Sequence, residues 1–120
     1  MTADPFTDRL ARVRDRFAAT LTGKIDEVCA ATPHFADALP SAPAAVAEAY
    51  RSVHSIVGVG RTVGFPASGN AAHDVAGILR SPQQQGRGLT ADEIALLTKM
   101  LQTLREVAAR ELQSSTSTGS

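Results

Sequence analysis

The fold of this chain is decided by the stretch Val53-His54-Ser55-Ile56-Val57-Gly58-Val59-Gly60-Arg61-Thr62-Val63-Gly64-Phe65. Its small and apolar residues recur at spacings of three and four, which places them on one face of an α-helix. These residues are Val53, Ile56, Gly60 and Val63. His54 lies beside that face, on a more open stripe that also contains Arg51, Gly58 and Arg61. The pattern therefore predicts the second half of a helix, with one buried side and one open side.

Three glycines in this stretch need an explanation, because a glycine inside a helix costs about 1 kcal/mol relative to alanine. Gly64 is explained as the helix stop, and Gly60 by close packing against another helix. Gly58 is predicted to point outward, next to His54. Its missing side chain leaves room beside the imidazole, and a phosphoryl group together with an incoming partner surface would fit there.

The same stretch carries a family resemblance. The pattern His-x-Ile-x-Gly-x-Gly-x-x-Val-Gly-Phe, which begins at His54 and ends at Phe65, resembles the motif of histidine-containing phosphotransfer (HPt) domains. It is most similar to the phosphotransfer domain of chemotaxis-type histidine kinases. The resemblance is strongest from Tyr50 to Leu79, and the helical layout extends it over most of the chain. It implies that His54 accepts a phosphoryl group on its ring.

The chain departs from the family pattern at two positions. The family usually has a lysine three residues after the histidine, where this chain has Val57. It usually has Glu or Gln on the next helix, facing the histidine ring, where this chain has Ala76. Neither replacement can donate a hydrogen bond to a phosphate or hold a ring nitrogen.

Other residues are expected to support His54. Arg51 and Arg61 lie one turn before and two turns after it, and their long side chains are expected to curve toward the phosphoryl group. His73 matches a position where chemotaxis-type domains often have a histidine. Val57 and Gly58 are expected to meet the docked partner, Val57 through apolar contact and Gly58 through clearance.

Length and composition limit the class of protein. The chain has 120 residues, of which 43% are hydrophobic, enough for one domain with a core. Its formal net charge is zero, so nucleic-acid binding is not expected. No apolar run approaches the ~20 residues of a membrane span, and the first residues lack the apolar segment of a signal peptide. We therefore expect a cytoplasmic protein, with Cys29 buried as a small hydrophobic residue.

Four amphipathic helices are predicted. Asp4-Pro5 opens the first, in which Gly23 is a candidate bend, and a capping box of Thr90 and Glu93 opens the fourth. The third is rich in Ala and Gly, so it should pack closely against the second. No strand pattern appears, and we predict an all-α protein that folds as an antiparallel four-helix bundle, which is also the fold that the resemblance implies. The predicted helices cover 5–31, 43–63, 66–80 and 91–112, within a single domain of residues 1–112; a loop is predicted at 81–89 and a disordered tail at 113–120.

The resemblance implies a simple chemistry. Phosphotransfer needs an exposed, neutral, nucleophilic histidine, and imidazole is largely neutral at cellular pH. In the family, a receiver domain brings the aspartate and the Mg²⁺, so no cofactor bound by this chain alone is expected. No Cys/His spacing predicts a metal site, and no nucleotide-binding loop is present. The chain is expected to be a phosphoryl carrier and not an enzyme with its own ATP-dependent kinase activity.

Three functions remain open at this point. The first is a phosphorelay intermediary that carries a phosphoryl group on His54 between response-regulator receiver domains or a histidine kinase. The second is a degenerate adaptor that binds receiver or kinase domains without phosphotransfer, which Val57 and Ala76 motivate. The third is a purely structural helical module.

Overall fold

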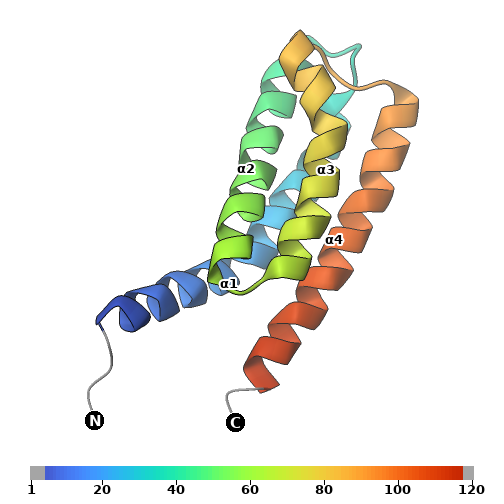
Figure 1. Cartoon of the computed structure of the whole chain (residues 1–120). Coiled ribbons are helices and arrows are strands. Elements are labelled where there is room, and N and C mark those ends of the chain that lie inside the picture. The colour runs from blue at the N-terminus through green and yellow to red at the C-terminus, as the bar shows by residue number, and fades with distance from the viewer. Residues whose placement is uncertain (1–4, 118–120) are drawn as a thin grey trace.

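The computed structural model describes the backbone of residues 5–117 and the side chains of residues 5–114. It contains four α-helices and one short 3₁₀ helix: α1 Pro5–Ala31, η1 Thr32–Phe35, α2 Ala42–Val63, α3 Pro66–Gln85 and α4 Ala91–Ser117. Figure 1 shows α2, α3, α4 and the second half of α1 packed along one another, with successive helices running in opposite directions. The predicted all-α four-helix bundle is confirmed. None of the helices in this part of the chain is long and apolar enough to cross a membrane.

The first helix is continuous across Gly23, but only its second half belongs to the bundle. Its buried side chains begin in the fourth turn and are Phe17, Leu21, Ile25 and Val28. The earlier members of the same apolar stripe are exposed, namely Phe6, Leu10 and Val13. Figure 1 shows the reason: the first turns of α1 project from one end of the bundle, beyond the neighbouring helices.

Close backbone packing brings α2 and α3 together, as the glycines and alanines predicted. A Cβ added to Gly60 would lie 3.2 Å from the Phe65 carbonyl oxygen and 3.4 Å from the Phe17 ring, so only glycine fits there without a shift. The turn between the two helices begins at Gly64, whose φ of 97° is in the left-handed region, and this confirms the predicted helix stop. The ring of Phe65 is buried against that of Phe17, with centroids 5.5 Å apart.

Two predicted helix ends were placed too early. The third helix continues to Gln85 instead of ending at 80, and it includes Pro82. Pro82 is buried, and we attribute the tolerance of this residue to its packing against the core, which offsets the lost hydrogen bond. The actual stop is Gly86, whose φ is 65°. The fourth helix continues to Ser117 instead of ending at 112, because no Gly or Pro interrupts it; the remainder of the predicted tail, 118–120, lies outside the described residues.

Two contacts fix the ends of α3 and α4. The predicted capping box at the start of α4 is confirmed: the Thr90 N–H donates to Glu93 Oε1 at 2.8 Å, and the Glu93 N–H donates to Thr90 Oγ1 at 3.2 Å. Hydrogen bonds from Arg87 and from the Thr90 backbone lower the pKa of Glu93 to about 2.

At the other end of the bundle, the carboxylate of Glu111 on α4 accepts two N–H groups at the start of α3, from Ala67 at 3.0 Å and Ser68 at 2.8 Å.

Candidate functional site

His54 lies in the middle of the exposed side of α2. The residues around it along the helix alternate as predicted: the stripe of Val53, Ile56, Gly60 and Val63 is buried, whereas Arg51, His54, Gly58 and Arg61 are exposed. The imidazole stacks on the Tyr50 ring one turn earlier, with centroids 5.8 Å apart and an interplanar angle of 16°. This stack places the ring against Tyr50 while the side chain stays exposed.

A groove runs beside His54, between α2 and the projecting part of α1. Its volume is about 510 Å³, and it is mostly apolar. Its walls are formed by Leu10 and Val13 of α1 and by His54, Ser55, Gly58, Val59, Thr62 and Val63 of α2. A Cβ added to Gly58 would meet no atom within 4 Å, which confirms that this glycine points into open space. The arrangement places a nucleophilic ring at the edge of an apolar groove, beside the open space at Gly58.

Comparison with known proteins identifies the family. The model of the family described as "Hpt domain" matches residues 12–107. The chain belongs to the Hpt domain family. No curated protein and no solved structure gave a significant match. Hpt domains are phosphoryl carriers and not kinases, and they interact with receiver domains and kinases in phosphorelays.

The structure corrects one predicted contact of this Hpt domain. Val57 was expected to touch a docked partner, but its side chain is only 8% exposed. It follows Val53 by four residues and precedes Gly60 by three, so it lies on the inner side of α2, at the contact with α3. The backbone of Val57 is close enough to α3 that a Cβ added to Gly69 would lie 3.4 Å from the Val57 carbonyl oxygen. Val57 therefore packs in the core and offers almost no exposed surface to a partner.

The two arginines predicted to support His54 differ in their surroundings. Arg51 is exposed one turn before His54. Arg61 instead donates from Nε and Nη2 to Asn70 Oδ1 on α3, at 3.2 and 2.9 Å, and its stem lies over Gly69. This contact ties Arg61 to the α2–α3 seam, so it contributes to holding the two helices together.

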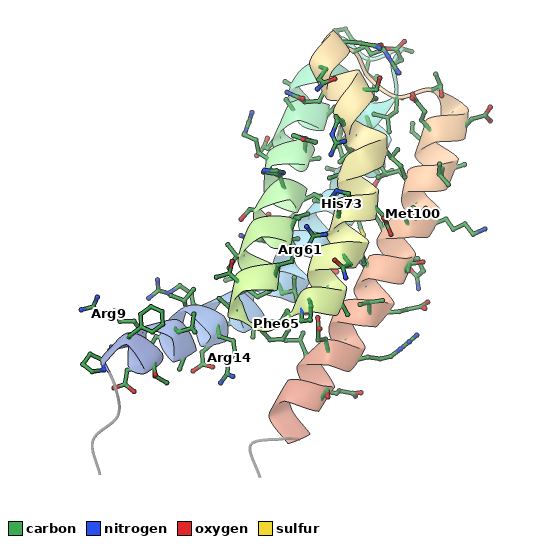
Figure 2. The ribbon with its side chains drawn as sticks, viewed as in Figure 1. Arg9, Arg14, Arg61, Phe65, His73 and Met100 are labelled. Carbon is green, nitrogen blue, oxygen red and sulfur yellow. The ribbon has the colours of Figure 1, made fainter. Side chains whose placement is uncertain are left out.

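His73 and Ala76 lie on α3, the helix that faces this part of α2. Ala76 is buried, with 2% of its surface exposed, which agrees with its predicted place in a thin helix. His73 is exposed, and Figure 2 shows it on α3 beside the seam that Arg61 spans. Within residues 5–114 the His54 ring stacks on Tyr50, and no hydrogen bond or ring contact joins it to His73.

Three side chains that contact His54 or its neighbours on α2 were missed by sequence reasoning. Tyr50 was detectable, because an aromatic residue four positions before a histidine on a helix is placed to stack on it. Lys24 of α1 was not detectable: its Nζ donates to Ser55 Oγ at 3.4 Å across the α1–α2 contact, next to the groove. Asn70, the partner of Arg61, likewise depends on how α2 and α3 pair.

The remaining metal-ligating and thiol side chains of the described residues form no second cluster. Among them is no group of three or more His, Cys, Asp or Glu side chains that could hold a metal ion. Cys29 is half-buried instead of fully buried, and burial raises the pKa of its thiol, which keeps it protonated and weakly nucleophilic.

Proposed function

We propose that this protein is a phosphorelay intermediary in which His54 carries the phosphoryl group through its Nε2 atom. The observation that supports this most strongly is the geometry of His54 within a chain of the Hpt family. Its ring is exposed, stacked on Tyr50 and placed beside the open position of Gly58. A phosphoryl group and the surface of its donor can reach the ring from that side.

In the proposed transfer, a lone pair on the neutral imidazole attacks the phosphorus of an aspartyl phosphate on a receiver domain. The P–O bond to the aspartate breaks as the P–N bond forms, and the carboxylate leaves as the anion. The receiver supplies the Mg²⁺ that neutralises the phosphoryl oxygens. The reverse reaction passes the group from His54 to the aspartate of a second receiver.

The proposed docking surface is the apolar groove beside His54. Leu10 and Val13 of α1 are exposed and Val59 of α2 is half-buried, and together they present apolar surface next to the clear space at Gly58. The positive charge for the phosphoryl oxygens is assigned to Arg51, one turn before His54, and to Lys24, whose Nζ donates to Ser55 next to the groove; Arg61 donates to Asn70 on α3 instead. A charge-assisted hydrogen bond contributes about 1.5–3 kcal/mol, which is comparable to what the usual family lysine would supply.

One observation favours a second candidate, an adaptor that docks on receiver or kinase domains without phosphotransfer. The two family positions that normally assist the histidine are Val57 and Ala76, and both are buried apolar residues. An adaptor would still bind its partner through the groove beside His54 but would not transfer the phosphoryl group.

The test is the transfer of radiolabel from receiver domains that have been phosphorylated with labelled acetyl phosphate. We expect the wild-type protein to retain acid-labile, base-stable label and His54→Gln to retain none while keeping the same far-UV circular dichroism. His34→Gln and His73→Gln are matched controls and should retain label. Label that persists on His54→Gln would show that the acceptor is wrong. Binding to receivers without any label on the wild type would select the adaptor.

A further inference from the structure

The projecting part of α1 has exposed apolar side chains, and one of them, Phe6, does not line the groove beside His54. Phe6 is 69% exposed, Val13 43% and Leu10 38%. Arg9 and Arg16 lie next to this apolar stripe, and in the described residues neither forms an ion pair. This helix is apolar on one side and has cationic residues beside that side. It is complementary to a groove with an apolar floor and an acidic rim.

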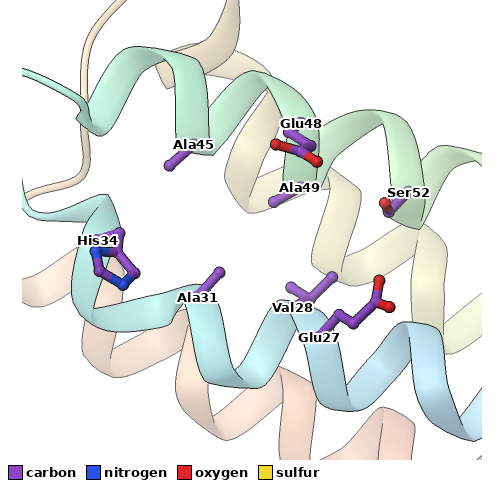
Figure 3. A pocket seen from close by; sticks show the side chains of 8 residues that line it. All are labelled: Glu27, Val28, Ala31, His34, Ala45, Glu48, Ala49 and Ser52. Atoms are coloured by element: carbon purple, nitrogen blue, oxygen red, sulfur yellow. The ribbon is translucent and has the colours of Figure 1, made fainter.

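The other end of the same α1–α2 face has that surface. A groove of about 390 Å³ lies between the end of α1 and the start of α2. Figure 3 shows the carboxylates of Glu27 and Glu48 on the two sides of this groove, one from each helix. Neither carboxylate forms an ion pair within the described part of the chain. The small side chains that line the groove are Val28, Ala31, Ala45 and Ala49.

The register of α1 relates the two ends. Arg9 and Glu27 are 18 residues apart, which is five full helical turns, so they point in the same direction about 27 Å apart. A two-fold axis across α1 near Ala18 therefore places Arg9 of each copy opposite Glu27 of the other. The same operation places Phe6, one turn before Arg9, at the level of Ala30, whose neighbour Ala31 lines the acidic groove.

We infer that the α1–α2 face binds a second copy of this chain, in a two-fold antiparallel arrangement of the two α1 helices. In it, Phe6 of each copy enters the small-residue groove of the other, and Arg9 pairs with Glu27 and Glu48 at its rim. A helix as long as α1 spans about 40 Å, and a face two helices wide gives a footprint on the order of 700 Å² per copy. That area is close to the ~800 Å² per partner of a standard specific interface.

Self-association has a consequence for phosphotransfer, which rests on the function proposed above. Leu10 and Val13 line the groove beside His54 and also lie on the face that the second copy covers. A receiver and a second copy then compete for the same surface, and the dimer is the form in which His54 is shielded.

The test measures self-association by sedimentation velocity over a range of concentrations, and it does not depend on phosphate. The variants are Arg9→Glu, and Glu27→Arg combined with Glu48→Arg; each should weaken the dimer about tenfold or more, because like charges then face each other. Arg14→Glu is the matched control. It makes the same charge change on the same segment, and Figure 2 shows Arg14 on a different side of α1 from Arg9. Arg14→Glu should dimerise like the wild type.

The decisive measurement is an equimolar mixture of the two charge-reversed proteins. Both halves of the resulting heterodimer again pair opposite charges, so dimers should reappear with wild-type affinity. Their recovery would also show that both variants are folded. A wild-type protein that stays monomeric up to roughly 1 mM would overturn the inference. So would a mixture that stays monomeric, or an Arg14→Glu variant that weakens the dimer as much as Arg9→Glu.

Discussion

Substitutions at Gly58 should have opposite effects on stability and on phosphotransfer. A side chain at this position should raise the stability of the fold and slow phosphotransfer. The residue lies inside α2, where glycine is unfavourable, and a Cβ at this position would meet no atom within 4 Å. Gly58→Ala and Gly58→Leu are therefore expected to fold without strain. Both should raise the free energy of unfolding by about 0.5–1 kcal/mol through helix propensity. For a domain of this size, that corresponds to an increase in Tm of about 2–6 °C.

The effect on phosphotransfer should have the opposite sign and depend on size. A leucine at Gly58 projects into the open space beside His54 and holds the partner surface away from the ring. In-line attack requires the reacting atoms to approach within about 3–3.5 Å, and a misplacement of about 1 Å costs roughly 100-fold in rate. We expect transfer to Gly58→Leu to be slower by about that factor, and transfer to Gly58→Ala to change much less.

The matched control is Gly23→Leu. Gly23 is also an exposed helix glycine with no atom within 4 Å of an added Cβ, but it does not line the groove beside His54. It should gain similar thermal stability and transfer phosphate at the wild-type rate. Tm by circular dichroism and single-turnover transfer from a labelled receiver provide the two readouts. Wild-type transfer by Gly58→Leu, or equal slowing of both leucine variants, would refute the clearance role.

Two further predictions concern acidic residues that cap helices. The folded-state pKa of Glu93 is lowered to about 2 by Arg87, so its stabilising effect is complete above ~4.3, the usual unfolded value, and is lost as the pH falls toward 2. Allowing for solvent screening, the effect is about 1–2 kcal/mol. Glu93→Gln should lower Tm at pH 7 and flatten its decline below pH ~4.3; parallel Tm curves for the two proteins would contradict this. Glu111→Ala removes the acceptor of two N–H groups at the start of α3, at a cost of about 1 kcal/mol, and should lower Tm by about 3–6 °C. Glu106→Ala on the same helix serves as its control, and an equal loss in both variants would argue against the cap.

The local features of this protein follow from its sequence. The buried stripe of α2 and the helix stop at Gly64 follow from a spacing of three to four residues and from the freedom of glycine at positive φ. The capping box of Thr90 and Glu93 follows from two residues three positions apart. Each of these depends on neighbours within about one helical turn, which the sequence lists directly.

The helix ends and the wall of the candidate site were decided by contacts between helices. Pro82 predicted a break, but its burial lets α3 run on to Gly86, where the positive φ ends it. Val57 was expected to make apolar contact with a docked partner, whereas the contact with α3 buries it. Leu10 and Val13 continue the apolar periodicity of the buried side of α1, but the helices around α1 end before reaching them, and they form one wall of the groove.

By itself, then, the sequence determined which residues share a helix face, where glycine must end or open a helix, and that His54 lies on an exposed side. Periodicity and backbone freedom are local properties, and they hold wherever the helix is placed. Only the tertiary structure decided which helix faces are covered by another helix and which remain exposed. It attached Arg61 to Asn70, brought Lys24 to Ser55, and left the start of α1 beyond the bundle. These outcomes depend on the relative lengths and register of the helices, since a side chain is buried or bound only where another helix reaches it.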